Sequence, residues 1–317
     1  MLTFLTRRLI GAVIVCIAVT FIVFVIFIVI PGGDPAVRIA GRTANDQNIA
    51  NIRHDWGFDK PFYTQYYRMM KKMFTGELVG TTNGQNVLDQ IVQGIPATFS
   101  LTIGAGIIWL FFGILVGVVS AITAGRWSDR VITILALIGI SMPVFWLGLI
   151  LRYYLGEGGV ATIFPDGGYT GLTANPLQWA YHLILPWFVL AVLFIGFYGR
   201  VLRGNILDTI NEDYVRTAKA KGLPWRQILT RHVLRTSLIP IVTLFGLDFA
   251  AVLGGGAILT ETVFDLHGVG QYAADNIQSL DLPPIMGVTM WGAIFIVVFS
   301  VLVDLFYAYL DPRIRPT

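Results

Sequence analysis

The residues of this chain that are able to perform chemistry are few and lie far apart. The four histidines, at positions 54, 182, 232 and 267, show neither an HExxH pair nor another spacing typical of metal ligands. The GxxxxGK[ST] loop that holds the phosphates of a nucleotide is absent, and no serine lies in a nucleophile arrangement with a histidine and an aspartate. The sequence therefore predicts a conduit without catalytic residues, metal ligands or a cofactor of its own. Any energy for active transport must come from elsewhere.

One carboxylate lies within a long apolar stretch. Asp248 is the single charged residue between positions 236 and 260. A carboxylate inside a membrane is costly unless it faces protein or a water-filled cavity, so Asp248 is a functional candidate. Two interpretations stay open: Asp248 lines a transport pathway, or it hydrogen-bonds to a neighbouring helix.

A second polar feature lies in the apolar run 131–151, which contains SMPVFWLG at residues 141–148. A proline there frees a backbone carbonyl and can kink the helix. The kink serves either packing alone or a polar notch that faces a pathway. The two features together supply the candidate pathway residues, which are Ser141, Met142, Pro143, Phe145 and Asp248.

A strongly basic segment, EDYVRTAKAKGLPWRQILTRHVLR at residues 212–235, separates two apolar runs. It is rich in helix formers as far as Gly222, after which Leu223 and Pro224 enforce a break. A second helical pattern begins at Trp225 and continues into the next apolar run. We expect a short helix, ended by glycine, on the cytoplasmic face of the membrane. By composition alone, this helix suits contact with anionic lipids.

Composition places these features in a membrane protein. Hydrophobic residues make up 55% of the chain and charged residues 13%, about half of the roughly 25% found in soluble domains. Six runs are long and apolar enough to cross a bilayer as helices: residues 9–30, 98–124, 131–151, 179–199, 236–260 and 285–303. The prediction is an all-α membrane protein with six transmembrane helices. Its single cysteine, Cys16, excludes an internal disulfide.

The distribution of lysine and arginine predicts the orientation of the chain. With both termini in the cytoplasm, the cytoplasmic segments hold 14 of the 22 basic residues, as the positive-inside rule requires. The expected organisation is a cytoplasmic tip and first span at 1–30, an extracytoplasmic segment at 31–97, a core with five spans at 98–309 and a cytoplasmic tail at 310–317. Helical spacing and aromatic residues in segment 31–97 predict a small external cap of short helices. The core includes a cytoplasmic loop at 204–235.

Part of that loop resembles a known family. RTAKAKG, followed by nine residues and HVLR, is similar to the cytoplasmic coupling loop of ABC importer permeases. Ala218 and Gly222 match the general pattern, whereas Arg216, Thr217 and Arg235 depart from it. These departures are typical of the dipeptide/oligopeptide/nickel branch.

The resemblance extends along nearly the whole chain and is closest to the first of that branch's two permease subunits. It is carried by PGGDP at 31–35, WGFDKPFYTQY at 56–66, IPATFSLT at 95–102, SMPVFWLG at 141–148, GAILTETVF at 256–264, HGVG at 267–270 and LVDLFYAYLDPRIR at 302–315. HGVG has histidine where the family usually has proline.

The resemblance implies the six-helix fold of type I ABC importer permeases in a bacterial inner membrane. It implies a coupling role for eight residues: Tyr214, Arg216, Thr217, Ala218, Lys219, Ala220, Lys221 and Gly222. It also implies four kinds of partner, namely a second permease subunit, two ATPase subunits that bind ATP and Mg, an extracytoplasmic substrate-binding protein and the lipid bilayer. No nucleic acid is expected.

The implied cargo is a di- or oligopeptide, with nickel complexes, glutathione or oligosaccharides as alternatives within the branch. A different class stays open as well: a proton-coupled secondary transporter in which Asp248 carries the proton. The loop around Gly222 discriminates between these classes, because a secondary transporter has no need of it. A membrane enzyme is the third class, and no catalytic constellation supports it.

Overall fold

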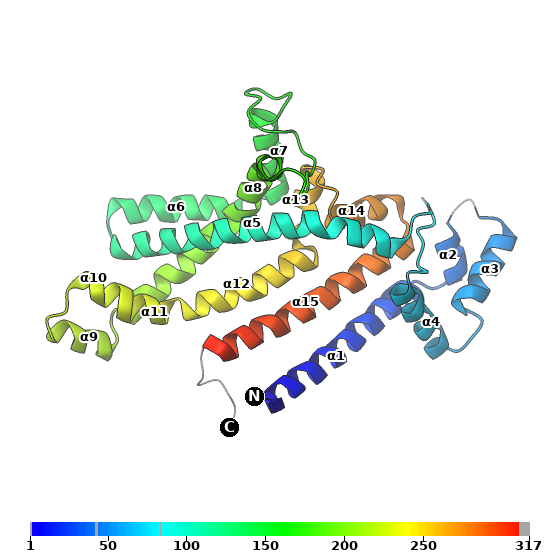
Figure 1. Ribbon diagram of the computed structural model, residues 1–317, viewed down its shortest axis with the longest axis horizontal. Coiled ribbons are helices and arrows are strands. Elements are labelled where there is room, and N and C mark those ends of the chain that lie inside the picture. The colour runs from blue at the N-terminus through cyan, green and yellow to red at the C-terminus, as the bar shows by residue number, and fades with distance from the viewer. Residues whose placement is uncertain (1, 42–43, 83, 311–317) are drawn as a thin grey trace. The chain divides into compact units, whose positions relative to one another are not determined.

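The computed structural model describes residues 2–41, 44–82 and 84–310 (Figure 1). In this part of the chain the secondary structure is helical apart from two isolated β-bridges, Val79 with Asn86 and Gly156 with Phe164. The all-α prediction is confirmed. Residues 311–317 of the predicted cytoplasmic tail, which include Arg313 and Arg315, lie outside the described residues.

The chain divides into two compact units. Unit 1 combines the residues up to Phe99 with those from Ala250 onward, and unit 2 comprises Ser100–Phe249. Five helical segments are long and apolar enough to span a membrane, and a bent pair of helices supplies a sixth span if it is counted as one. The five segments are Thr6–Val29, Val87–Ile122, Pro176–Thr209, Ile239–Gly256 and Leu282–Val303, and the bent pair is Trp127–Ser141 with Val144–Leu155.

Several predicted span boundaries differ from the structure, and two of these differences have an evident local cause. The second span belongs to α5 (Val87–Ile122), which begins 11 residues earlier than expected, because the side chain of Asn86 accepts a hydrogen bond from the backbone nitrogen of Leu88 at 2.9 Å. The fifth span, α12 (Ile239–Ala251) continued by the π-helix η3 (Val252–Gly256), ends before residue 260. Gly255 has a φ of 137°, which L side chains rarely adopt, so the helix breaks at this glycine.

The predicted external cap in unit 1 is helical, as expected. It consists of α2 (Pro35–Ala40), α3 (Asp46–Trp56) and α4 (Phe62–Thr75). Asp34 of the PGGDP sequence caps α2 by accepting a hydrogen bond from Ala36 N at 2.9 Å. The same carboxylate pairs with Arg53 of α3, and this arginine holds the pKa of Asp34 below its ordinary value. The motif therefore ties α2 to α3.

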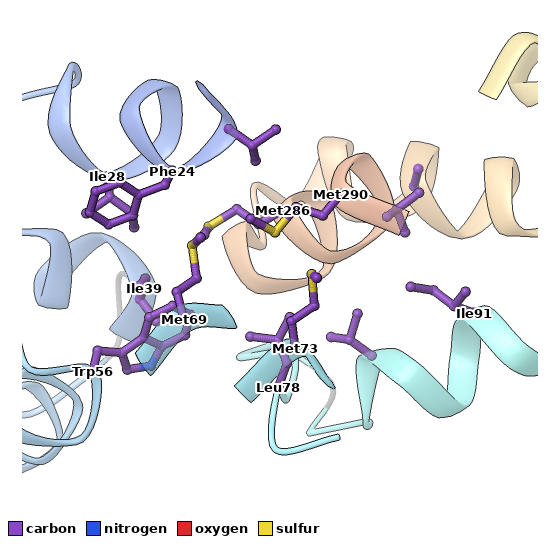
Figure 2. Close-up of a cluster of buried hydrophobic side chains, with 14 residues drawn as sticks. Phe24, Ile28, Ile39, Trp56, Met69, Met73, Leu78, Ile91, Met286 and Met290 are labelled. Carbon is purple, nitrogen blue, oxygen red and sulfur yellow. The ribbon is translucent and has the colours of Figure 1, made fainter. Parts of the chain in front are cut away.

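These cap helices share a hydrophobic core with the membrane helices of unit 1. The helix α1 (Leu2–Phe24), continued by the π-helix η1 (Val25–Val29), packs against α15 (Leu282–Leu310). Figure 2 shows Phe24 and Ile28 beside Trp56 and Met69 of the cap, with Met73, Met286 and Met290 continuing the cluster. The unbranched methionines fill the irregular space between helices that cross at different angles.

An arginine binds the backbone carbonyls at the C-terminal end of the first span. Arg38 of α2 donates hydrogen bonds to Phe27 O at 2.9 Å and Ile28 O at 3.0 Å. These carbonyls lie in the last turn of the helix, where no intrahelical donor remains. The guanidinium therefore supplies the missing donors and holds a positive charge at the level of residues 27–28.

Unit 2 is built on the close approach of α5 and α8 (Pro176–Thr209). A Cβ at Gly113 would lie 2.8 Å from Tyr198 Cβ, and one at Gly117 would lie 2.7 Å from Leu202 Cβ, so neither position has room for a side chain. Small residues let membrane helices approach until their backbones are in contact. Within this unit, α5 therefore packs directly against α8.

An ion pair between a buried aspartate and a partly exposed arginine fastens α6 (Trp127–Ser141) to α8. Asp129 is buried and accepts two hydrogen bonds from the Arg203 guanidinium, at 2.9 and 2.8 Å. Its carboxylate also accepts hydrogen bonds from Ser120 Oγ and from Gly125 N, the latter at 3.0 Å. No local sequence pattern indicates this cluster, because its members lie up to 83 residues apart in the sequence.

Glycine substitutions test the contact between α5 and α8. A Cβ at Gly104 would overlap the indole ring of Trp187, whereas one at Gly106 would lie at an ordinary 3.4 Å from the Phe249 ring. We expect Gly104→Ala to lower the free energy of unfolding by about 1–3 kcal/mol through overpacking, and Gly106→Ala to leave it nearly unchanged. Thermal unfolding of both purified variants in the same detergent measures the difference. Equal melting temperatures would contradict the close packing.

Candidate functional site

A short exposed helix, α9 (Asp213–Ala220), follows α8 and lies at the far end of unit 2 from α7 (Figure 1). Only Val215 and Ala218 on its inner face are buried. Their spacing of three residues places both on one side of the helix. Seven of the eight predicted coupling residues are exposed, and Ala218 is the exception. The predicted short helix is confirmed.

The helix ends in the hydrogen-bond pattern of a Schellman motif. Leu223 N donates to Ala218 O at 3.4 Å and Gly222 N donates to Lys219 O at 2.9 Å. Gly222 has a φ of 77°, with nothing within 4 Å of where a Cβ would lie. Glycine is therefore required by the backbone at this position and not by a neighbouring atom. Pro224 then starts α10 (Trp225–Gln227).

The helix α9 packs against the segment that follows it and is linked by one hydrogen bond to a polar cluster that includes the buried Thr209 and Ser237. After α10 the chain passes through the π-helix η2 (Ile228–Val233) and α11 (Leu234–Ser237) into α12. Ser237 Oγ lies 3.1 Å from Thr209 Oγ1 and donates to Asn205 O at 3.2 Å. Tyr214 of α9 donates to Thr236 Oγ1 at 3.2 Å. These bonds join α9 and the end of α8 to the start of the fifth span.

The exposed side of α9 and the residue that follows the helix carry three cations and one anion, since Arg216 pairs with Asp213 at 3.5 Å. Arg216, Lys219 and Lys221 are exposed, and Lys219 Nζ lies 5.6 Å above the ring of Trp225. A cation at this distance from an indole face is attracted by the ring quadrupole. Positive side chains are therefore exposed to solvent at a helix whose opposite side, with Val215 and Ala218, is buried in unit 2.

The predicted kink at Pro143 is a complete break. The helices α6 and α7 (Val144–Leu155) are bent by 100°. Ser141 Oγ donates to Leu137 O at 2.8 Å, inside its own helix. Ser141, Met142 and Pro143 line a shallow hollow of about 430 Å³ together with Ile138 and Trp146. Phe145 is exposed beside it, so four of the five predicted pathway residues lie together.

Asp248 lies elsewhere in unit 2 and has a partner. Tyr198 of α8 donates a hydrogen bond to Asp248 Oδ2 at 2.7 Å. The tyrosine side chain is fully buried, and its ring packs against Phe194, which stacks on Trp109 at 4.4 Å between ring centroids. Asp248 therefore makes the hydrogen bond to a neighbouring helix that one interpretation required. Its role in a pathway stays a prediction.

A buried carboxylate in unit 1 belongs to the GAILTETVF motif but is not among the residues predicted for a site. Glu261 lies on α13 (Ile258–Val263), beyond the end of the fifth span, and has 0% of its surface exposed. Its carboxylate accepts hydrogen bonds from Thr98 Oγ1 at 2.7 Å, from Gln271 N at 2.9 Å and from Gly270 N. No basic side chain is among these partners.

Glu261 thus caps the amino terminus of α14 (Val269–Ser279). Thr98 completes the cap, because its hydroxyl accepts a hydrogen bond from Val269 N at 3.0 Å. The first backbone N–H groups of a helix lack intrahelical acceptors and attract negative charge. A Cβ at Gly268 would overlap the carboxylate, and one at Gly270 would lie 2.9 Å from it. In the sequence, the signal for this buried cap was the glycine-rich GVG at 268–270, which follows shortly after the acidic TET at 260–262.

Burial and hydrogen bonding act on the Glu261 carboxyl in opposite directions. The bonds from Thr98, Gln271 and Gly270 lower its pKa, but burial outweighs them and raises the pKa above the ordinary value.

Across residues 2–41, 44–82 and 84–310, no group of three or more His, Cys, Asp or Glu side chains lies close enough to hold a metal ion.

Comparisons with known proteins match nearly the whole chain. The family model described as "Binding-protein-dependent transport system inner membrane component" matches residues 113–316, and the model for the N-terminal part of such membrane components matches residues 1–102. The chain is 39% identical to a probable D,D-dipeptide transport system permease protein, DdpB, of Escherichia coli K12, over 98% of this chain and 96% of the relative. It is 35% identical to the dipeptide transport system permease protein DppB of Alkalihalophilus pseudofirmus, over 99% of this chain and all of the relative.

A solved structure shares the fold. A chain of the MetNI methionine ABC transporter, in an inward-facing conformation, aligns with a TM-score of 0.52 and 18% sequence identity. The alignment covers 72% of this chain and 98% of that chain. The part of this chain without a counterpart there amounts to about a quarter of its length.

Substitution of Glu261 tests the buried cap. Glu261→Ala leaves a hydroxyl and two backbone N–H groups without acceptors in a buried site, so we expect a loss of about 3 kcal/mol in the free energy of unfolding. Glu261→Gln keeps one carbonyl acceptor and should therefore lower the free energy of unfolding by less than Glu261→Ala does. Thermal unfolding in detergent ranks the variants, with the exposed Glu157→Gln as a control that leaves the melting temperature unchanged. An alanine variant as stable as the control would contradict the cap.

The same residue predicts a pH dependence. Because its pKa is raised on folding, the contribution of Glu261 to stability is complete below its unfolded pKa of about 4.3 and is lost as the pH rises through the folded value. The melting temperature of the wild type relative to Glu261→Gln should therefore fall as the pH rises from about 4 to 8. A difference that stays constant over this range would contradict the raised pKa.

Proposed function

This chain belongs to the family of binding-protein-dependent transport system inner membrane components, and on that premise we propose that it is one transmembrane subunit of an ATP-driven importer. It is a multi-pass protein of the inner membrane. In this proposal it forms half of a translocation pathway and has no catalytic residue or cofactor of its own. ATP and Mg are bound and used by partner subunits.

The observation that carries the proposal is the construction of α9. Its inner face is held by Val215 and Ala218, whereas its outer face offers Arg216, Lys219 and Lys221 to solvent. A short helix of this kind fits a groove on a partner protein. We infer that the groove belongs to a cytoplasmic ATPase and that acidic side chains there orient the contact.

The polar cluster linked to α9 gives the docked helix a way to act on the membrane helices. Movement of α9 would be passed through Tyr214, Thr209 and Ser237 to the end of α8 and the start of α12. Closure of two ATPases on ATP would then swing the spans between outward-open and inward-open arrangements, a rigid-body transition between two states. The break at Ser141–Pro143 and the Asp248 carboxylate are the proposed pathway features within this unit.

We propose di- or oligopeptides as the cargo, because the relatives reported above are named as dipeptide transport permeases at 35–39% identity over nearly the whole chain. The partners would be a second permease subunit, two ATPase subunits and an extracytoplasmic substrate-binding protein that selects the cargo. Both termini are proposed to lie in the cytoplasm, since this places the basic segment with α9 on the cytoplasmic side.

Affinity purification of the tagged chain in mild detergent, followed by mass spectrometry, tests the assembly. We expect a second permease, an ATPase and a binding protein to copurify, and peptide eluted from the binding protein to identify the cargo. The double variant Lys219→Glu/Lys221→Glu should lose the ATPase and keep the second permease, because only the charge on α9 is reversed. Lys60→Glu, an exposed reversal in the cap segment, should keep both partners. A chain that purifies alone and transports solute with a proton gradient would overturn the proposal.

Substitution of two glycines distinguishes an effect on coupling to the ATPase from an effect on stability. Gly222 and Gly125 have φ values of 77° and 79°, and neither has a neighbour within 4 Å of a Cβ position. Replacing either glycine by alanine should destabilise the protein by a similar amount, about 1–2 kcal/mol of backbone strain. We expect Gly222→Ala to reduce transport-coupled ATP hydrolysis in the reconstituted complex several-fold, and Gly125→Ala to preserve it. Equal losses of coupling in both variants would show that the turn after α9 has no special role.

A further inference from the structure

The helix α4 in unit 1 is anchored against the apolar part of α1. The Tyr66 hydroxyl lies 2.7 Å from Thr20 Oγ1, and its ring contacts Phe21 and Phe24 with centroids 5.6 Å apart in both cases. Thr20 lies nine residues before the end of the apolar segment Thr6–Val29, about 14 Å along a helix axis. A tyrosine side chain is shorter than this distance, so the backbone of α4 lies beside hydrocarbon-spanning residues.

The other end of α4 lies beside a second span at a similar depth. Phe74 contacts Trp291 of α15 edge-to-face, with ring centroids 5.6 Å apart. Trp291 is nine residues inside the apolar segment Leu282–Val303, again about 14 Å from its start. Both ends of α4 are therefore beside the apolar parts of α1 and α15, as the cluster in Figure 2 also shows for Met69 and Met73 between them.

The side chains of α4 fall into three sectors around the helix. Tyr66, Met69 and Met73 form the buried sector, which packs on the spans. Arg68 and Lys72 form a polar sector that faces α3: Lys72 pairs with Asp55 at 2.7 Å, and Arg68 donates to the His54 carbonyl. At 3.6 residues per turn, the third sector comprises Tyr63, Tyr67 and Phe74.

This third sector is aromatic and exposed. Tyr63, Tyr67 and Phe74 are 63%, 67% and 55% exposed, and Phe62 in the first turn is also exposed. Lys71 follows at the edge between the aromatic and polar sectors. The exposed surface is continuous with α1, since Phe21, itself exposed on that span, contacts Tyr66. An amphipathic helix with aromatic side chains on one face and basic ones on another is typical of a helix lying in a membrane interface.

We propose that α4 lies within the bilayer, in the leaflet where α1 ends, with Tyr63, Tyr67 and Phe74 in contact with lipid. The polar sector and α3 then face the aqueous side, and Arg38 at the end of α1 marks the headgroup level. The segment predicted as an external cap is therefore partly embedded. The leaflet is the outer one in the orientation proposed above, but the embedding itself depends on neither that orientation nor the cargo.

Site-specific probes in lipid test the proposal. The single cysteine is removed by Cys16→Ser, and an environment-sensitive fluorophore is attached to Tyr67→Cys in the full chain, reconstituted in nanodiscs with its copurifying subunits. Two matched positions serve as references: Ile26→Cys on the exposed side of the first span and Gln47→Cys on the polar, exposed α3. Quenching by nitroxide-labelled lipid and by aqueous iodide is measured for each.

The expected result is a blue-shifted emission at Tyr67→Cys that loses most of its intensity to nitroxide lipid and little to iodide, as at Ile26→Cys. The probe at Gln47→Cys should show the reverse. Quenching of Tyr67→Cys by iodide alone would overturn the proposal in favour of an aqueous cap. Protection from both quenchers would overturn it in favour of a protein partner covering the aromatic sector. Because the readout is depth and not transport, either failure leaves the proposed importer function separately testable.

Discussion

Every backbone N–H and C=O inside a bilayer needs a hydrogen-bond partner within the protein, and the structure of this chain follows from that constraint. Its spans are continuous helices wherever side chains are apolar, and each departure from a regular helix has an identifiable partner or residue. Arg38 satisfies the carbonyls at the end of α1, and Glu261 with Thr98 satisfies the first N–H groups of α14. Helix breaks occur at Pro143 and Gly255. Polar side chains at these helix ends therefore complete the backbone hydrogen bonding that the helices leave open.

The two units use different means to hold their helices together. Unit 2 relies on glycines that bring α5 and α8 into backbone contact and on the Asp129–Arg203 pair, which needs further donors because isolated buried charges are costly. Unit 1 relies on adaptable methionines between α1, α4 and α15 and on the capped start of α14. In both, the residues proposed for function rest on these supports: α9 on the Thr209–Ser237 cluster, and the aromatic sector of α4 on Tyr66 and Met69.

The distribution of charge separates the roles of the two units. The exposed cations of α9 are carried on a helix with small buried residues, which suits a contact that can be made and released with a cytoplasmic partner. On α4, by contrast, Arg68 and Lys72 turn toward the carbonyl and carboxylate of α3, and the aromatic residues occupy the free face. Basic residues in a membrane protein thus serve either recognition or orientation, depending on which side chains surround them.

Sequence alone determined the helical class, the approximate spans, the short helix before Gly222 and a kink at Pro143, because hydropathy, glycine and proline act through the local backbone. That this kink is a complete break was decided by the structure. The sequence also identified Asp248 as unusual, without its partner. Tertiary structure decided that Tyr198 bonds this carboxylate and that Asp129 meets Arg203. It also decided that Glu261 caps a helix that begins eight residues farther along, and that α4 lies beside two spans. Each of these depends on which residues of separate segments come into contact, and a local pattern of hydrophobicity does not contain that information.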